Sequence, residues 1–434
     1  MLHREAWPVI DYRAHPAFAP HAVAPQAALE QEVEGLVAQA NEALRTRYDA
    51  GEHLPEAELE SWLERELATP FERLRELCAA TLPTDQVMSH CLDAALRDAS
   101  EDARAEARFR NRVAEPRSRR MARTERAVLH ELRANSIVVG QLDPQQIRAM
   151  ATDLEPQMAL LRESESAERG TRSWRILPRA GAYYRVLQQA LDEHGYTGAT
   201  SAFHGCEMEL LSVNLVYSHE RERWWRDCYA DQGLPTSPAT YFHHDQDWHQ
   251  IKAVIYLTPA TRESGAFSFI EGGHRFRQGN ALAHIYFHLT HAMDRAAAAA
   301  NAGLPHYYRR AFSVAGLRAG FVGLPRILQG ATHFGDDLLE GSPQTAALLA
   351  RERIVESGTG NIVLFNGGDL LHRGGLVQRG ERWSLQLMFG PRVTPAQRLL
   401  ARAQHTALVA AGRALGWRRL DQLRSRRRSQ RGTM

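Results

Sequence analysis

The densest group of side chains able to do chemistry lies in the segment YFHHDQDWH, residues 241–249. Successive side chains of a strand point to opposite faces, so an extended backbone would place His243 and Asp245 on one face. An imidazole and a carboxylate arranged in this way can bind a divalent metal from one side. A His-x-Asp pair is also common among surface and turn residues, so a metal site requires a further ligand.

The candidate for that ligand is His372, in the segment NIVLFNGGDLLHRGG. There an apolar run reaches a Gly-Gly turn and then presents a histidine. Two imidazoles and one carboxylate on one side of a metal leave coordination positions open, which suits non-haem Fe(II). Ten residues later, Arg382 begins the run RWSLQLMFG. An arginine among apolar residues needs an anion, and its planar guanidinium favours a carboxylate.

Hydrophobic periodicity predicts the elements that must position these residues. From residue 207 onward, short β-rich runs bounded by glycine or proline predict a sandwich or barrel such as a jelly roll. These runs are MELLSVNLVY, KAVIYLTP, AFSFIEGG, NIVLFNGG and WSLQLMFG. On the last run, Arg382, Ser384 and Gln386 should share one face. Earlier in the chain, residues 137–139 predict a short strand, and Asp143 followed by proline predicts the start of a helix.

The domain organisation follows from changes in this pattern. Residues 1–125 are predicted to form an arm and a helical extension. Residues 99–128, which overlap its end, are so rich in charge that a solvated helix or linker is expected. Residues 126–395 form the core, with a partly helical insertion at 277–352, and 396–434 form a final helix and a basic tail. The insertion is expected to act as a lid, with hinges at Gly303, Gly316, Gly320 and Gly323.

Composition excludes several classes of protein. The 434 residues are enough for two or three domains, and a formal net charge of +2 argues against a dedicated nucleic-acid binder. The chain lacks an apolar run long enough to cross a membrane and begins without the pattern of a signal peptide, so a cytoplasmic location is expected. The four cysteines form no CxxC motif. The oligomeric state cannot be read from the sequence.

The segment FHHDQDWHQIKAVIYLTPATRESGAFSFIEGGHR resembles the phytanoyl-CoA dioxygenase-like branch of the Fe(II)/2-oxoglutarate oxygenases. The His-x-Asp pair, the apolar strand, the Gly-x-His-Arg-like end at residues 272–275 and the spacing from His372 to Arg382 carry this resemblance, over about residues 126–395. It implies an α+β protein with a double-stranded β-helix core of the jelly-roll or cupin type. The chain departs from the family's pattern at Gly273, where serine is frequent, and in its extension and insertion.

The resemblance also implies roles for the matching residues. His243, Asp245 and His372 would hold Fe(II), and Arg382 would pair with the distal carboxylate of 2-oxoglutarate. Further contacts to this co-substrate are expected from Asn214, Ser212 and Ser384. The implied reaction consumes O2 and 2-oxoglutarate, releases succinate and CO2, and hydroxylates an unactivated carbon of a small or carrier-linked metabolite in a biosynthetic pathway. Related halogenases lack the carboxylate of the pair, so Asp245 favours hydroxylation, desaturation or cyclisation.

Several residues admit two interpretations. Around the site, Tyr241, Asp247, Trp248 and His249 would contact substrate or serve only as turn and packing residues. Lys252 would reach an anionic substrate or lie solvated at the rim. Histidines 284, 288 and 291 share one helical face, which suits zinc, although a polar helix is the preferred interpretation. For the whole chain, the alternatives are a metal-dependent isomerase or hydrolase and a non-catalytic binding protein on the same barrel.

Overall fold

The computed structural model describes residues 8–24, 26–50, 52–81, 86–114, 121–164, 173–177, 182–221, 229–235, 237–245, 250–300 and 311–392. Residues 1–390 form one compact unit, which combines helices with two antiparallel sheets, and Pro391–Met434 form a second unit. The predicted C-terminal helix and basic tail lie outside the described residues. The mixture of helices with antiparallel sheets confirms the predicted α+β class.

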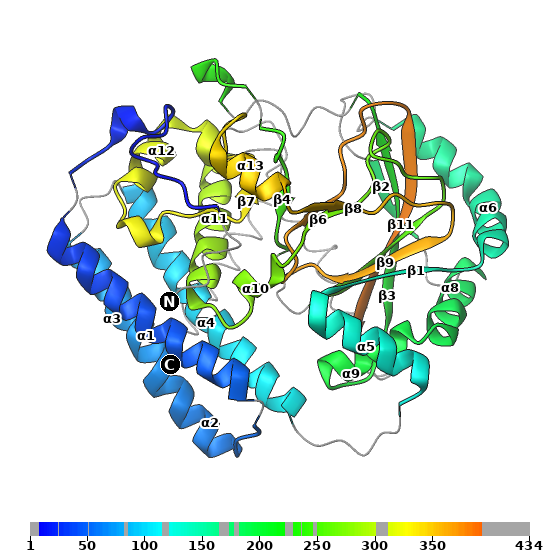
Figure 1. Ribbon diagram of the computed structural model, residues 1–434, viewed down its shortest axis with the longest axis horizontal. Helices are drawn as coiled ribbons and strands as arrows, with labels where there is room; N and C mark the ends of the chain where they lie inside the picture. Colours follow the sequence, from blue (N-terminus) through cyan, green and yellow to red (C-terminus); the bar gives the residue numbers. More distant parts are fainter. Residues whose placement is uncertain are drawn as a thin grey trace, which may run out of the picture. The chain divides into compact units, whose positions relative to one another are not determined.

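The larger sheet has six strands in the order β1-β9-β5-β11-β3-β2 (Figure 1). Their bounds are β1 Ile137–Gln141, β2 Ser173–Ile176, β3 Met208–His219, β5 Ile251–Tyr256, β9 Asn361–Asn366 and β11 Glu381–Pro391. On β11 the alternation is as predicted, because Trp383, Leu385 and Leu387 are buried in the core beneath the helices. Arg382 and Ser384 face the other way, toward the second sheet.

The smaller sheet has five short strands in the order β7-β4-β10-β6-β8. Their bounds are β4 Phe242–His243, β6 Ser268–Ile270, β7 His333–Phe334, β8 Glu352–Ile354 and β10 His372–Arg373. A compact apolar cluster that includes Tyr256, Phe267 and Phe365 contains residues of both sheets. The two sheets therefore face one another across shared apolar residues, and the remaining space between them is available for a site.

Helices cover the outer face of the six-stranded sheet. They are α5 Arg123–Asn135, α6 Pro144–Arg162, α8 Ala182–Glu193 and α9 Tyr196–His204. Helix α6 begins as predicted, because the Asp143 side chain accepts a hydrogen bond from the backbone N–H of Gln145 at 2.9 Å. In Figure 1, α6 and α8 lie along the outer side of the sheet, where their apolar residues join its core.

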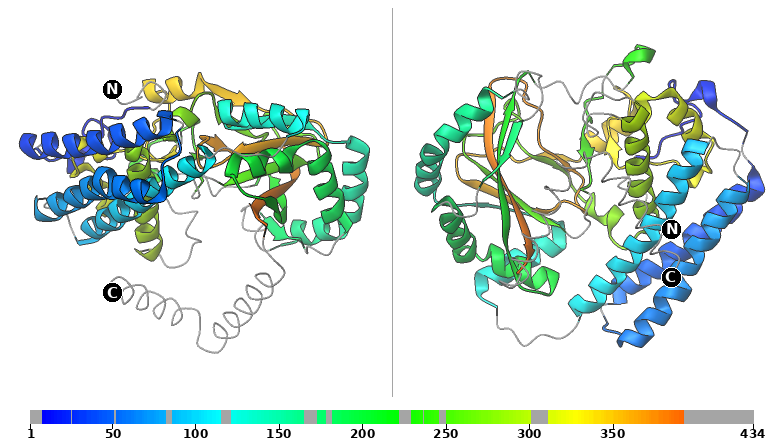
Figure 2. Two further views of the ribbon diagram at one scale, coloured as in Figure 1. Left: turned by 90° about the horizontal axis from the view of Figure 1, so that it is seen from below. Right: turned by 180° about the vertical axis from the view of Figure 1, so that it is seen from behind.

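The N-terminal extension is helical, as expected, and forms a helical layer together with helices of the insertion (Figure 2). It comprises α1 Ala27–Ala50, α2 Glu56–Trp62, the π-helical turn η3 Leu63–Ala68, α3 Thr69–Thr81 and α4 Gln86–Ala114. The expectation of a solvated segment at 99–128 is wrong for α4. Its alanines at 99, 103 and 107 and its Glu106 are buried, because α11, Ala281–Ala300, packs against that face.

The insertion at 277–352 contributes to the smaller sheet as well as to the helical layer. It contains α11, α12 Ala315–Val322, β7 and α13 Pro343–Leu349, and β7 pairs with β4. Phe334 of β7 and Phe321 of α12 are buried in the same core as α4. Gly303 lies outside the described residues, and closure of this segment as a lid stays a prediction.

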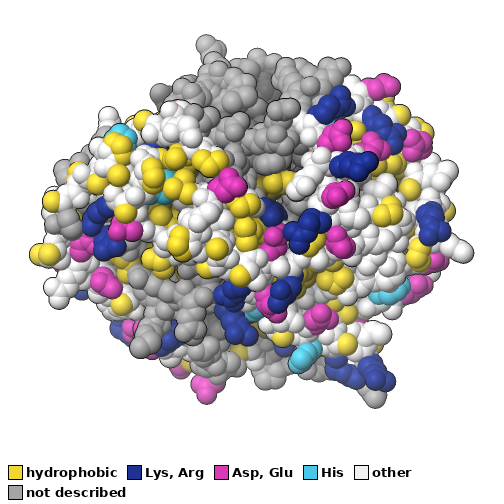
Figure 3. All heavy atoms as spheres, turned by 45° about the horizontal axis from the view of Figure 1, so that its top comes forward, with side chains coloured by type: hydrophobic (Ala, Val, Ile, Leu, Met, Phe, Trp, Pro, Cys, Tyr) yellow, Lys and Arg dark blue, Asp and Glu magenta, His cyan; other side chains and the backbone are white. Residues whose placement is uncertain are grey.

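On the face drawn in Figure 3, basic and acidic side chains are interspersed. Among the described residues, no helix has both the length and the apolar character needed to cross a membrane.

Candidate metal centre

The three predicted metal ligands meet at one point of the smaller sheet. His243 ends β4, His372 begins β10, and the two are directly paired in the antiparallel register. Asp245 lies just beyond β4 rather than within a strand, so the expectation that strand alternation alone would align it with His243 is not met. A hydrogen bond from the backbone N–H of Asp245 to the carbonyl of Gly367 at 2.8 Å fixes its position instead.

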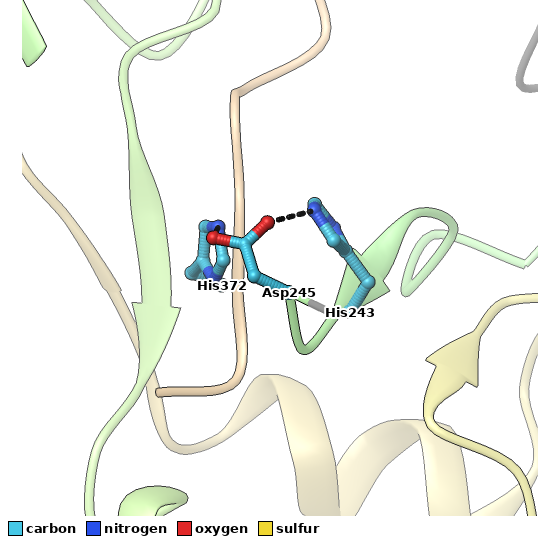
Figure 4. A group of neighbouring side chains, drawn as sticks. All are labelled: His243, Asp245 and His372. Carbon is cyan, nitrogen blue, oxygen red and sulfur yellow. Dashed lines mark ion pairs between the residues drawn. The ribbon is translucent and has the colours of Figure 1, made fainter. Parts of the chain in front are cut away.

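The ligand atoms converge closely enough to share one ion. Asp245 lies between the two imidazoles (Figure 4), with Oδ1 3.8 Å from Nε2 of His243 and Oδ2 3.8 Å from Nε2 of His372. One ligand atom from each residue lies within 4.8 Å of the others. Within the described part of the chain, this is the one group of histidine, cysteine and acidic residues with that property.

Backbone carbonyls orient both imidazoles. Nδ1 of His243 lies 3.0 Å from the carbonyl of Tyr241, and Nδ1 of His372 lies 2.8 Å from the carbonyl of Leu370. A proton on each Nδ1 donates to these carbonyls and leaves each Nε2 lone pair directed at the centre. Tyr241 adopts a φ of 70°, which is rare outside glycine, and a backbone held in this conformation is frequent at functional sites.

The protonation states also suit a metal site. Burial lowers the pKa of His372, and burial together with the nearby charge of His372 holds the pKa of His243 well below its usual range. Burial raises the pKa of Asp245, but the charge and the hydrogen bond of Lys252, together with the two neighbouring histidines, outweigh burial, so this pKa lies below its ordinary value. At neutral pH the centre therefore offers two neutral imidazoles and one carboxylate, the forms that bind metal.

Position 367 must be a glycine because the carboxylate of Asp245 lies directly against its backbone. A Cβ atom built at Gly367 would lie 1.7 Å from Oδ2 and 2.7 Å from Cγ of Asp245. Any side chain at this position would displace the carboxylate from the two imidazoles. In the sequence, this position is visible only as part of the Gly-Gly turn before His372. Spacing alone does not show that the glycine makes room for the carboxylate of Asp245.

A cavity of about 360 Å³ opens beside the three ligands, between the two sheets. Its walls combine apolar and polar residues: Val216, Val254, Tyr256, Phe267, Phe365 and Met388, with Asn214, Tyr241, Lys252, Ser384 and Gln386. Arg382 also lines it and is 4% exposed. The guanidinium donates to the carbonyl of Gly375 at 3.2 Å and to Oγ of Ser218 at 3.1 Å, which holds it in place.

The other predicted contacts divide into three groups. Asn214, Ser384 and Tyr241 line the cavity, and Oδ1 of Asn214 is buried with no hydrogen-bond partner among the described residues. Ser212 lies on the same strand but outside this lining. Asp247, Trp248 and His249 lie outside the described residues.

The residues that line the cavity have the chemistry expected of the predicted metal and co-substrate site. A buried guanidinium at one wall, with three metal-type ligands at another, fits a metal ion together with an anionic organic ligand. From the sequence, Lys252 was expected either to contact an anionic substrate or to lie solvated at the rim of the site. Its side chain is 12% exposed and its Nζ lies 2.7 Å from Oδ2 of Asp245, so it belongs to the centre.

Comparison with known proteins gives matches to solved structures only. No protein-family model matches the chain, and no curated relative does. The epimerase SnoN, in a complex with Fe3+, alpha-ketoglutarate and nogalamycin RO, is 13% identical with a TM-score of 0.35, over 62% of this chain and 83% of SnoN. A Pseudomonas putida prolyl-4-hydroxylase is 13% identical with a TM-score of 0.32, over 62% of this chain and 100% of that chain.

EctD from S. alaskensis with bound Fe is 9% identical with a TM-score of 0.35, over 61% of this chain and 76% of that chain. Several matched structures are thus iron- or 2-oxoglutarate-dependent enzymes. Similarity of this extent is too low to assign a fold family or an activity, so the assignment rests on the residues of this chain.

Proposed function

We propose that this protein is an Fe(II)/2-oxoglutarate-dependent oxygenase built on a double-stranded β-helix, as the resemblance to phytanoyl-CoA dioxygenase-like proteins implies. The observation that supports it most is one cavity that combines His243, Asp245 and His372 with a buried Arg382. Three protein ligands leave room on the metal for a co-substrate and O2. An isomerase or hydrolase would need the metal but not a buried anchor for a dicarboxylate.

Each residue has a defined task in this proposal. The two imidazoles and the carboxylate hold Fe(II), which with bound 2-oxoglutarate and O2 supplies the oxidising chemistry, with succinate and CO2 as products. Arg382 binds the distal carboxylate of 2-oxoglutarate through its planar fork, and Ser218 and Gly375 keep that fork oriented. Asn214 and Ser384 supply polar contacts along the same wall.

The chain's remaining contribution is to orient the substrate and exclude water. Phe267 and Phe365 pack against His372, with ring centroids 5.6 and 4.7 Å from it, and keep one side of the centre apolar. The retained carboxylate of Asp245 favours hydroxylation, desaturation or cyclisation over halogenation. We propose hydroxylation of a small metabolite, with a location in the cytoplasm.

The test is anaerobic titration of the Fe(II)-loaded protein with 2-oxoglutarate, read by the weak visible charge-transfer band of the chelate. The wild type should show the band. In Arg382→Ala the affinity for 2-oxoglutarate should fall by about 30-fold to several thousand-fold, because a buried charged pair loses one partner at a cost of about 2–5 kcal/mol. Absence of the band in the wild type would overturn the proposal.

A matched control is Arg353→Ala, which removes an arginine that is 55% exposed and paired with Glu271 on the surface. This variant should bind 2-oxoglutarate as the wild type does. If Arg382→Ala changes the affinity by less than about threefold, roughly 0.7 kcal/mol, another residue anchors the carboxylate.

A further inference from the structure

Lys252 is the only lysine in a chain with 53 lysine and arginine residues, and it lies in the cavity beside the metal ligands. On β5 its register partners are Met388 of β11 and Phe365 of β9. Its Nζ lies 2.7 Å from Oδ2 of Asp245, and the side chain is 12% exposed. A nearly buried ammonium at this place requires a compensating anion.

Asp245 cannot satisfy both Lys252 and a metal ion equally well. The oxygen that contacts Lys252 is also the one that lies 3.8 Å from Nε2 of His372, on the side where a shared ion would bind. A divalent ion there draws the carboxylate's charge to itself and adds positive charge next to the ammonium. Once the centre is loaded, the single negative charge of Asp245 would be shared between the ion and the ammonium, so a further anion beside Lys252 would be stabilised.

The two cations of the cavity lie toward opposite ends of the sheet. Lys252 is paired with Met388, whereas Arg382 is six residues earlier on the same strand. Six strand residues span about 20 Å of backbone. Arg382 and Lys252 thus belong to different positions along the strands that line the cavity, so the two cations can bind different ligands.

The net charge of the cavity also favours an anionic substrate. Among the described residues that line the cavity, Asp245 is the one acidic side chain, beside the cations Arg382 and Lys252. A divalent ion and a doubly charged 2-oxoglutarate cancel, so the loaded cavity keeps one positive charge in excess. A substrate with one negative charge would neutralise it.

We propose that Lys252 binds a free carboxylate of the substrate, and that the substrate class is small carboxylic acids rather than acids linked to a carrier as thioesters. This inference rests on the proposed function, because it assumes that Arg382 and the metal are occupied by the co-substrate. Lys252 is then a specificity-determining residue, which holds the substrate's acid group on the side of the metal away from Arg382.

The test uses anaerobic protein loaded with Fe(II) and 2-oxoglutarate, and two acid–amide pairs of equal shape: benzoate with benzamide, and hexanoate with hexanamide. Binding is read by the shift of the charge-transfer band. In the wild type, each acid should bind at least about tenfold more tightly than its amide. The preference should disappear in Lys252→Gln and persist in Lys252→Arg, since arginine keeps the charge.

A second measurement uses only the wild-type protein, so it does not depend on whether a Lys252 variant folds. Reductive methylation of the loaded wild type, followed by mass spectrometry, reports on the single lysine directly. Benzoate should slow methylation of Lys252 by at least about fivefold, and benzamide should not, because only an anion covers the ammonium. Equal rates with both compounds would overturn the proposal.

The outcomes separate this inference from the proposed function. Absence of the chelate band in the wild type overturns the function itself. A normal band with no acid preference, or a preference that survives in Lys252→Gln, overturns only the role of Lys252. If Lys252→Gln weakens 2-oxoglutarate binding as much as Arg382→Ala does, Lys252 holds the co-substrate, and the proposal is also overturned.

Discussion

A comparison of two histidine–carboxylate clusters among the described residues shows that one has the geometry of a metal site and the other does not. In the metal centre, His243, Asp245 and His372 direct their ligand atoms at one point. In the second cluster, between α4 and α11, each histidine is matched to its own carboxylate. His284 lies 2.8 Å from Glu106, and His288 lies 2.7 Å from Asp102.

The difference shows that residue type and burial do not define a metal site. In the helical cluster each Nε2 forms a direct hydrogen bond with a separate carboxylate, so these ligand atoms do not converge on one point. In the metal centre each Nδ1 is bonded to a backbone carbonyl, which leaves Nε2 available. For His284 and His288, the preferred interpretation as polar residues of a helix face agrees with the structure, although their partners are buried. His291 differs, because its ring lies against Phe287 and His333, and its Nε2 has no hydrogen-bond partner among the described residues.

The largest expected effect comes from removing a ligand of the metal centre. In His243→Ala or His372→Ala, metal binding and the chelate band should be lost, because two ligands on one side bind Fe(II) too weakly. The measurement is Fe(II) titration with 2-oxoglutarate. The control is His130→Ala on exposed α5, and a band retained in both ligand variants would contradict the assignment.

Gly367→Ala should have the next largest effect on metal affinity, without removing any ligand. The new methyl group would overlap the Asp245 carboxylate, so we expect a loss of about 10- to 100-fold. Gly358→Ala is the matched control, because its Cβ would meet only Oδ1 of Asn361, at 3.6 Å. Equal metal affinity in both variants would show that Asp245 is not held in this position.

Glu106→Ala should affect stability instead of metal binding. It leaves the buried Nε2 of His284 without its hydrogen-bond partner, which costs about 1–3 kcal/mol in the free energy of unfolding. Urea unfolding measures this cost, with Glu64→Ala, whose side chain is 71% exposed, as the control. A fall in the metal affinity of Glu106→Ala by more than about tenfold would instead show that the two clusters are energetically coupled.

The smallest effect concerns Asp369, which lies between the two clusters. Burial raises its pKa to about 6, Arg110 opposes this, and Glu106 adds to it. Because the folded-state pKa is raised, its contribution to stability is full below the ordinary value of 3.8 and is lost as pH rises through about 6. The stability of the wild type relative to Asp369→Asn should therefore decrease between pH 4 and pH 7.

Unfolding at a series of pH values checks this prediction. Asp98→Asn, at a side chain that is 44% exposed on α4, serves as the control and should show no such trend. A pH-independent difference between the wild type and Asp369→Asn would mean that this carboxyl is not protonated in the folded protein.

The sequence by itself determined the features that depend on short-range spacing. The alternation on β11 placed Arg382 and Ser384 on the cavity face and Trp383 in the core, because a strand has a period of two. Asp143 before a proline marked the start of α6 for an equally local reason. The types of the metal ligands were also evident, since they follow from the chemistry of imidazole and carboxylate.

Only the tertiary structure decided what depends on contacts between distant segments. The register that pairs His372 with His243, the bond from Asp245 to Gly367, and the contact from Lys252 to Asp245 all join different strands or loops. The charges of α4 looked solvated because a sequence pattern cannot show that a distant helix supplies partners for them. Burial and pairing are properties of the packed chain, and they separate a metal site from a cluster of satisfied histidines.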